Sequence, residues 1–133
     1  MRSPSDRTIA AAIAARQAAY APYSGFLVGA AVRAESGVIY SGCNVENAAY
    51  PEGVCAEAAA IAAMVMAGDR HIQEIAVAGG GDHLCTPCGG CRQKIREFAA
   101  DTTPILVCGP DGLRRRFTLG ELLPSSFGPD NLA

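Results

Sequence analysis

Two short stretches of the sequence, Cys-Ala-Glu at residues 55–57 and Pro-Cys-Gly-Gly-Cys at residues 87–91, decide how the whole chain is interpreted. The first stretch opens a predicted helix over residues 55–67, which is followed by Gly68 and carries an apolar stripe of Ile61, Met64 and Val65. In the second, Thr86 and Pro87 form a suitable N-cap and first position for another helix. Both stretches are therefore predicted to lie at helix N-termini.

Three cysteines in these stretches have the spacing of metal ligands. Cys88 and Cys91 are three residues apart, so their thiols share one helix face, and a helix N-terminus favours the thiolate form. Cys55 and Glu57 are two residues apart, but within a first helical turn both can reach a group beyond the helix end. Three thiolates with an open fourth position suit a catalytic zinc, whereas a structural zinc site is usually closed by four ligands. We therefore predict a Zn²⁺ site with Cys55, Cys88 and Cys91 as its ligands.

Outside these stretches the sequence alternates between helical and extended patterns. A first helix is predicted from Pro4, with Ser3 as its N-cap, to a point before Pro22. Extended segments are expected as a hairpin at residues 27–34 and 38–43 and as strands at residues 75–78, 105–108 and 114–118, before a short helix at residues 119–123. Because the hairpin is antiparallel while strand-helix-strand units favour parallel pairing, we predict an α/β sandwich with a mixed sheet.

The composition limits the class of protein. The chain has 133 residues, 50% of them hydrophobic and 18% charged, so we expect one domain over residues 1–133 with a buried core. A net charge of −2 lacks the broad positive field that nucleic-acid binding needs. Six cysteines without a signal peptide indicate metal or thiol chemistry in the cytoplasm, and no stretch is long enough to span a membrane.

The order of the two stretches matches the signature of the zinc deaminases of bases, with cysteine as the first ligand. The chain resembles the small homotetrameric cytidine deaminases from about residue 21 to residue 130. Further matching segments, in order, are residues 23–24, 26, 28–31, 44–51, 91–93 and 122–129. The resemblance implies the family's fold, a three-layer α/β/α sandwich with a mixed five-stranded sheet, which agrees with the element order predicted above.

The resemblance also implies an activity, the hydrolytic deamination of free cytidine in pyrimidine salvage. Zinc would activate a water that attacks C4 of the pyrimidine, and Glu57 would take the water proton and deliver protons to N3 and to the leaving amine. Uridine and ammonia are the expected products, and deoxycytidine is expected to react in the same way. A polynucleotide substrate is disfavoured because the chain is short and mildly acidic.

Six further positions receive roles from the resemblance alone. Asn44 and Glu46 would bind the ribose hydroxyls, the backbone of Ala56 would contact the base, and Phe26 would pack on it. Tyr50 and Phe127 would reach the active site of a neighbouring subunit. The expected assembly is therefore a homotetramer with shared sites.

One position departs from the family pattern. Where most relatives have an arginine that follows the catalytic glutamate and donates to the zinc thiolates, this chain has Ala58. Three thiolates on Zn²⁺ leave a net charge of about −1, so another positive group should offset it. Helix N-termini supply part of this charge, and Arg92 or Arg96 is the expected source of the rest.

Other interpretations stay open on the sequence alone. Cys85 extends the Cys-x-x-Cys spacing, so a closed structural zinc site of Cys55, Cys85, Cys88 and Cys91 is one alternative. A second is an enzyme for a modified or antibiotic cytosine nucleoside, and a third is a non-catalytic zinc protein that binds nucleosides. A substrate panel and the metal content separate these alternatives.

The remaining cysteines and histidines have simpler predicted roles. Cys43 and Cys108 lie in apolar strands and are expected to be small hydrophobic residues. His71 and His83 stand among polar loop residues and are expected to be solvated. The arginines at residues 114–116 are expected to protect an edge strand rather than to bind nucleic acid.

Overall fold

Helix α1 (Pro4–Arg16) begins at a capping box in the computed structural model, which describes residues 2–133. The Ser3 hydroxyl accepts from the Asp6 N–H at 3.1 Å, and the Asp6 carboxylate accepts from the Ser3 N–H at 3.1 Å. Helix α1 ends before Pro22, as predicted, and its last residue is Arg16. The N–H groups of residues 17–19 bond to carbonyls three residues earlier, and Tyr20 then leaves the helix to pair its N–H with the Asn44 carbonyl at 3.0 Å.

A mixed sheet of five strands forms the centre of the molecule, as predicted. Its strands are β1 (Gly29–Ala34), β2 (Ile39–Cys43), β3 (Ile72–Ala78), β4 (Pro104–Gly109) and β5 (Gly112–Thr118), in the order β2-β1-β3-β4-β5. Only β3 and β4 pair in parallel, and the other neighbours are antiparallel. Strand β3 begins three residues before its predicted start. The prediction left these residues out because Glu74 is charged, and the sequence pattern did not indicate that it is buried.

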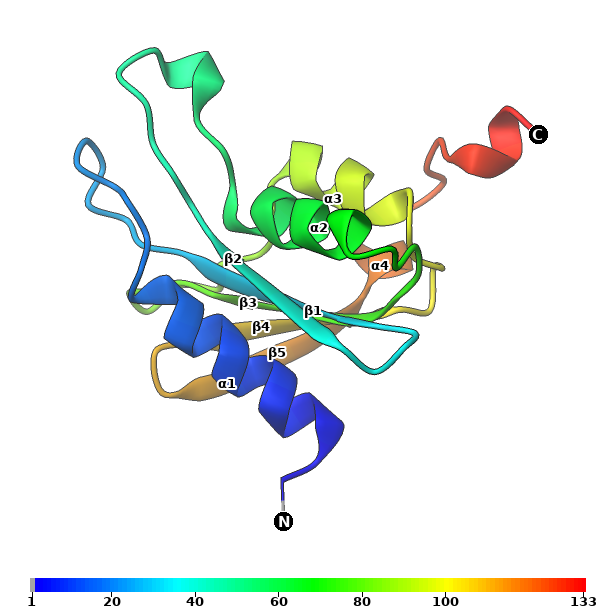
Figure 1. The fold of residues 1–133 in the computed structure, drawn as a ribbon, viewed down its shortest axis with the longest axis horizontal. Helices are drawn as coiled ribbons and strands as arrows, with labels where there is room; N and C mark the ends of the chain where they lie inside the picture. The colour runs from blue at the N-terminus through cyan, green and yellow to red at the C-terminus, as the bar shows by residue number, and fades with distance from the viewer. Residues whose placement is uncertain (1) are drawn as a thin grey trace.

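Helices cover both faces of this sheet, which confirms the three-layer α/β/α prediction (Figure 1). Helix α1 packs on one face over a small cluster of Ala12, Ala31, Ala76, Ala78, Leu106 and Cys108. Helices α2 (Ala56–Met66) and α3 (Gly89–Arg96) pack on the other face over a larger core, which includes Val32, Ile61, Met64, Ile75, Ile95, Ile105 and Leu119. Leu119 opens the short helix α4 (Leu119–Leu122) and is fully buried.

The helical layers lie unusually close to the sheet at two glycines. A Cβ added to Gly29 would lie 2.1 Å from the Ala12 carbonyl oxygen of α1. On the other face, a Cβ added to Gly42 would lie 2.5 Å from the backbone nitrogen of Ala60 in α2. Both contacts are backbone contacts that cannot move aside cheaply, so these positions require glycine. The many alanines of α1 and α2 serve the same purpose, because small side chains allow this close approach.

The N-terminus of α3 lies two residues later than predicted. Cys88 is the N-cap and the helix begins at Gly89, whereas Thr86 was predicted as the cap. The Thr86 hydroxyl instead accepts a hydrogen bond from the Arg92 guanidinium at 3.2 Å. Cys55 is the N-cap of α2, so each of the two helices starts immediately after a cysteine.

Two short 3₁₀ helices, η1 (Tyr50–Glu52) and η2 (Pro129–Asn131), lie in segments that extend beyond the layered body (Figure 1). Segment 44–54 leads from β2 to α2, and the C-terminal segment follows α4. Cys108 is buried and Cys43 half-buried, while His71 and His83 are exposed. No helix within residues 2–133 has the length and apolar character needed to cross a membrane.

Candidate active site

The N-termini of α2 and α3 bring three cysteine sulfurs together. The sulfurs of Cys55, Cys88 and Cys91 all lie within 4.8 Å of one another. In a tetrahedral site with Zn–S bonds of about 2.3 Å, the sulfurs lie roughly 3.8 Å apart, so small side-chain rotations suffice to accommodate the ion. Thiolates are also the ligands that zinc accepts readily. The donor set therefore fits Zn²⁺ with three protein ligands.

The closed four-cysteine site does not form in the described structure. Cys85 lies outside the group of mutually close sulfurs. Its side chain packs instead against Gly79, where an added Cβ would lie 2.6 Å from the Cys85 sulfur. Desolvation by burial, with the nearby charge of Glu57, raises the pKa of the Cys85 thiol. Cys85 is thus a half-buried neighbour of the site that keeps its proton.

The three clustered thiols differ in their acidity. The backbone N–H of Cys91 donates to the Cys88 sulfur and lowers the pKa of Cys88. Desolvation raises the pKa of both Cys55 and Cys91, and the charge of Glu57 adds to this effect. A metal that binds here as a trithiolate must therefore displace the protons of Cys55 and Cys91.

Glu57 occupies the first turn of α2 and is only 4% exposed. Desolvation raises the pKa of its carboxyl, although its own backbone N–H and the Cys91 thiol act in the opposite direction. A carboxyl group with a raised pKa beside a metal-ligand cluster keeps its proton to a higher pH than an exposed glutamate does and can exchange that proton with a ligand. This is the chemical property that a general acid and base needs.

The hydrogen bonds of Arg92 and Arg96 within residues 2–133 go to groups other than the clustered thiols. Arg92 donates to the carbonyl oxygens of Pro87 at 2.7 Å and Leu122 at 2.8 Å. Arg96 donates to the Ser126 hydroxyl at 3.0 Å and lies 3.6 Å from the Asp130 carboxylate. Both guanidinium groups therefore hold the C-terminal region on α3, and Arg92 also fixes the residue before Cys88.

Comparisons with known proteins agree with this geometry. Residues 2–107 match the family described as the cytidine and deoxycytidylate deaminase zinc-binding region. A cytidine deaminase of Sporosarcina psychrophila is 41% identical over 96% of this chain and 94% of its own length. The crystal structure of a cytidine deaminase from Burkholderia pseudomallei has a TM-score of 0.85 and 42% identity, covering 91% of this chain and 97% of that chain. The corresponding structure from Mycobacterium tuberculosis has a TM-score of 0.82 at 35% identity, covering 96% and 99%.

The chain belongs to the cytidine deaminase family. It is therefore an enzyme of that family, and its cofactor is Zn²⁺. The match covers the segments that carry all three clustered cysteines and Glu57. Family membership thus agrees with the site geometry, while the role of each side chain is argued below.

Two residues with expected roles in ribose binding, Asn44 and Glu46, lie between β2 and α2. The Asn44 side chain accepts from the Val28 N–H at 2.9 Å and donates to the Phe26 carbonyl at 2.9 Å. An amide has two N–H donors and an oxygen with two lone pairs, so Asn44 keeps one donor and one acceptor for a ligand. Glu46 accepts from the N–H groups of Tyr23 at 2.9 Å and Ser24 at 3.1 Å, and from the Ser24 hydroxyl.

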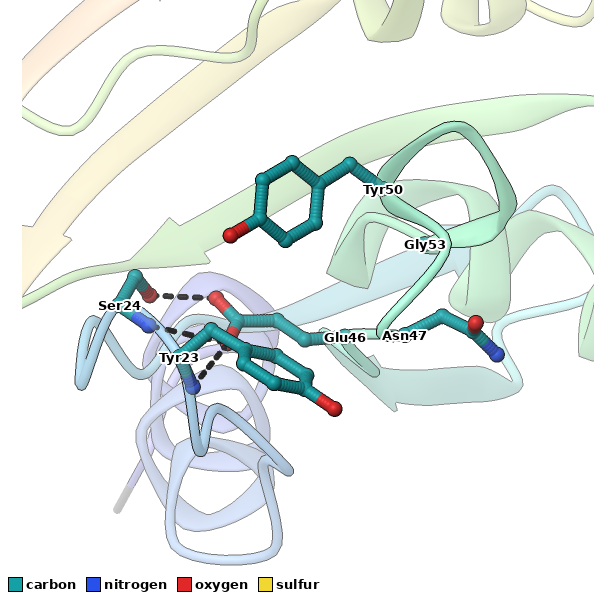
Figure 2. Close-up of a pocket in the computed structure, with 6 residues that line it drawn as sticks. All are labelled: Tyr23, Ser24, Glu46, Asn47, Tyr50 and Gly53. Carbon is teal, nitrogen blue, oxygen red and sulfur yellow. Dashed lines mark hydrogen bonds between the residues drawn. The ribbon is translucent and has the colours of Figure 1, made fainter.

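These hydrogen bonds lower the pKa of Glu46, with the Ser24 hydroxyl as the largest cause, so its carboxylate stays ionised. Figure 2 shows this carboxylate facing residues 23 and 24, with the Tyr50 ring on the other side. A cavity of about 410 Å³ lies here, lined by Tyr23, Ser24, Glu46, Asn47, Tyr50 and Gly53. None of its lining residues is a cysteine, so this cavity adjoins the predicted sugar-binding residues and not the thiols.

The two phenylalanines lie in different places. Phe26 is 46% exposed, and the tip of its ring lies 3.3 Å from the position of a Cβ on Gly79. Phe127 is 58% exposed on the C-terminal segment, where its carbonyl accepts from the Gln93 side chain at 2.9 Å. Ala56, whose backbone was expected to contact the base, is 1% exposed as the first residue of α2. Phe26 therefore lies beside Gly79 and Cys85, whereas Phe127 lies along α3.

Sequence reasoning missed one charged residue near the site, Lys94. This residue lies on α3, and its side chain shares a cavity with Ala58 of α2. The available signal was its spacing, because Lys94 follows Cys91 by three residues and so lies one helical turn away. That signal was too weak on its own to predict contact with a second helix.

Proposed function

We propose that the protein catalyses the hydrolytic deamination of free cytidine and deoxycytidine, releasing uridine or deoxyuridine and ammonia, in pyrimidine salvage. The observation that carries this proposal is the buried Glu57 carboxyl beside three convergent thiols at two helix N-termini. Membership of the cytidine deaminase family supports the choice of substrate. The acidic net charge of −2 supports a small nucleoside over a polynucleotide.

Cys55, Cys88 and Cys91 hold the metal, and Glu57 moves the protons in this proposal. Zinc held by these three cysteines would lower the pKa of a coordinated water to about 7 and so would supply a nucleophile near neutral pH. Glu57 accepts a proton from the attacking water and delivers protons to N3 of the pyrimidine and to the departing amino group. General acid–base catalysis of this kind contributes roughly 10² to 10⁴ in rate.

The substrate is oriented by residues on two separate segments. Asn44 and Glu46 bind the ribose hydroxyls, since a carboxylate accepts and an amide both donates and accepts. The Ala56 backbone lies at the start of α2, where N–H groups have no partner within the helix, and contacts the base. Phe26 packs its ring against the base.

We also propose a homotetramer in which Tyr50 and Phe127 complete the site of a neighbouring subunit. Tyr50 is 77% exposed, and both residues lie on segments that extend beyond the layered body (Figure 1). A Phe127→Ala variant should retain zinc and lose at least about 1 kcal/mol of transition-state stabilisation, by steady-state kinetics. Full activity in this variant, or activity in a monomer by analytical ultracentrifugation, contradicts the shared site.

A substrate panel with metal-quantified protein tests the proposed activity. The decrease in ultraviolet absorbance is followed with cytidine, deoxycytidine and modified cytosine nucleosides, using protein as prepared, stripped by a chelator and reloaded with zinc. Turnover of cytidine that depends on zinc supports the proposal. Turnover of a modified nucleoside alone, or zinc binding with no turnover, contradicts it and indicates a different substrate or a non-catalytic role.

A further inference from the structure

The candidate site gathers negative charge that the surrounding structure must offset. Three thiolates around a divalent ion carry a net charge of about −1, and Glu57 lies beside them when it is ionised. Ala58, the residue after Glu57, provides no charge. Arg92 and Arg96 are held by Pro87, Leu122, Ser126 and Asp130. Among the hydrogen bonds of residues 2–133, neither arginine donates to the clustered thiols, which leaves room for another cation to act on them.

Lys94 is placed to supply this charge. It is the only lysine in the sequence and lies on α3, one turn after Gly90, which is one of the two glycines between Cys88 and Cys91. A Cβ added to Gly90 would lie 3.7 Å from the Lys94 Nζ atom, so the ammonium group lies back along the helix toward its N-terminus. A cation is unfavourable near a helix N-terminus unless negative groups are also present there. The thiolates and Glu57 are such groups.

Lys94 of α3 and Ala58 of α2 line the same cavity. A cavity of about 420 Å³ between α2 and α3 is lined by Ala58, Ile61, Ala62, Gln93, Lys94, Glu97 and Phe98. Within residues 2–133 the ion pairs closer than 4.0 Å are Arg33–Glu74 and Arg96–Asp130, so Glu97 does not hold Lys94 in a close pair.

We infer that Lys94 is a positioning residue that offsets the charge of the zinc–thiolate group from α3, in place of an arginine at position 58 on α2. This inference rests on the metal site within the proposed function. A lysine ammonium is a point charge on a flexible stem, so it stabilises the thiolates through its charge and not through a rigid fork of hydrogen bonds. A positive charge at position 58 or at position 94 can offset the thiolate charge because both positions line one cavity.

Zinc affinity, measured by competition with a chromophoric chelator, tests this inference without any substrate. Loss of a group that supports metal ligands typically lowers metal affinity by 10-fold to 100-fold. Because Lys94 is exposed, we expect Lys94→Gln to lower zinc affinity by about 10-fold. Lys94→Arg should keep nearly the wild-type affinity, and adding Ala58→Arg to Lys94→Gln should restore it. Arg116→Gln, which removes one exposed positive charge from β5, is the matched control and should change nothing.

Each outcome decides the inference. Unchanged zinc affinity in Lys94→Gln overturns it, as does an equal loss in Lys94→Arg, which would indicate a packing role. Failure of Ala58→Arg to restore affinity also counts against it. If the wild type binds zinc but does not turn over cytidine, the proposed function fails while the inference about Lys94 stands. If the wild type binds no zinc, both fail.

Discussion

Two glutamates in this molecule have side chains that solvent barely reaches, yet their pKa values shift in opposite directions. Glu74 on β3 is 2% exposed and Glu57 on α2 is 4% exposed. Burial acts to raise the pKa of Glu74, but hydrogen bonds from Arg33, Ser5 and Thr8 outweigh it and hold the pKa below its usual value. At Glu57 burial prevails, and the pKa is raised. The Arg33 guanidinium and the hydroxyl donors around Glu74 therefore set the direction of its pKa shift, whereas the partners of Glu57 do not overcome its burial.

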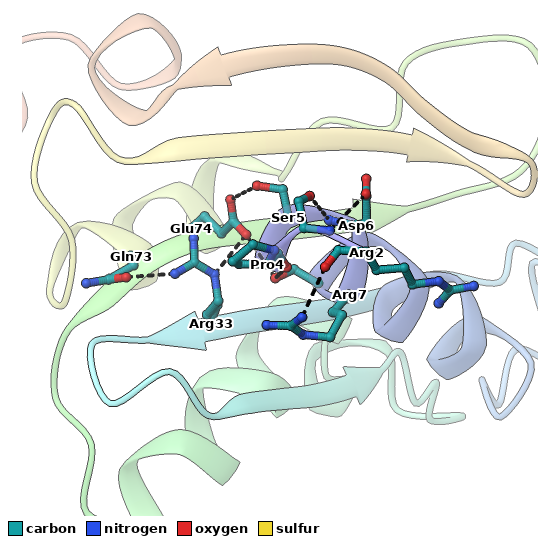
Figure 3. Close-up of polar contacts among 10 residues, drawn as sticks. Arg2, Pro4, Ser5, Asp6, Arg7, Arg33, Gln73 and Glu74 are labelled. Atoms are coloured by element: carbon teal, nitrogen blue, oxygen red, sulfur yellow. Dashed lines mark hydrogen bonds and ion pairs between the residues drawn. The ribbon is translucent and has the colours of Figure 1, made fainter.

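The partners of Glu74 join α1 to the sheet. Its carboxylate accepts from the Ser5 hydroxyl at 2.8 Å, the Thr8 hydroxyl at 2.9 Å and the Arg33 guanidinium at 3.0 Å (Figure 3). Arg33 donates in turn to the Gln73 side chain at 2.7 Å. A fully paired carboxylate of this kind stabilises a fold, whereas a carboxyl that is buried with few partners is available to exchange protons with a ligand.

The largest expected effect is a loss of activity, without a loss of stability, when Glu57 is replaced. Glu57→Gln removes the proton carrier, so kcat should fall roughly 10² to 10⁴-fold while zinc content is retained. The unfolding free energy should stay within about 1 kcal/mol, because glutamine has nearly the same shape and no buried charge. Steady-state kinetics, metal analysis and urea unfolding on the same preparation measure all three quantities. A variant that keeps wild-type kcat contradicts the assigned role.

At Glu74 we expect the reverse, a loss of stability without a loss of activity. Glu74→Gln leaves the Arg33 guanidinium without its carboxylate, and the unfolding free energy should fall by about 1 to 3 kcal/mol. We place the loss at the lower end because Arg33 is 19% exposed and partly solvated. The kcat of the folded variant should match the wild type. Glu35→Gln, at an exposed turn position, is the control, and equal stability of the two variants would contradict the structural role of Glu74.

A smaller effect follows from the titration of Glu74. Its folded-state pKa lies below the usual value of 4.5, so its stabilisation is fully present above pH 4.5 and is lost as the pH falls through the lowered folded-state pKa. The unfolding free energy of the wild type should therefore decrease more steeply than that of Glu74→Gln as the pH falls below 4.5. Urea unfolding of both proteins across this range measures the difference, and parallel curves would rule out a lowered pKa.

The features that sequence reasoning predicted are those that local patterns control. The Ser3 N-cap of α1, the hairpin of β1 and β2, and the mixed sheet all follow from short-range signals. The convergence of Cys55 with Cys88 and Cys91 was also predictable, because each cysteine lies at a helix N-terminus beside a recognisable motif.

Contacts between distant segments were not predictable in the same way. Glu74 is buried because Arg33, 41 residues away in sequence, lies beside it on a neighbouring strand. Arg92 and Arg96 were expected near the thiols, but the C-terminal segment packs on α3 and occupies both. The position of Lys94 facing Ala58 depends on how α2 packs against α3. None of these contacts can be recognised from a short stretch of the sequence.

The origin of the product oxygen is the most direct test of hydrolytic deamination. Zinc-loaded protein is given cytidine in water enriched in ¹⁸O, the uridine is analysed by mass spectrometry, and the released ammonia is quantified. We predict one solvent ¹⁸O atom in each uridine and one ammonia released per uridine, with no label in uridine incubated alone. Uridine without solvent oxygen, or no ammonia from a fully zinc-loaded protein, would contradict the proposed reaction.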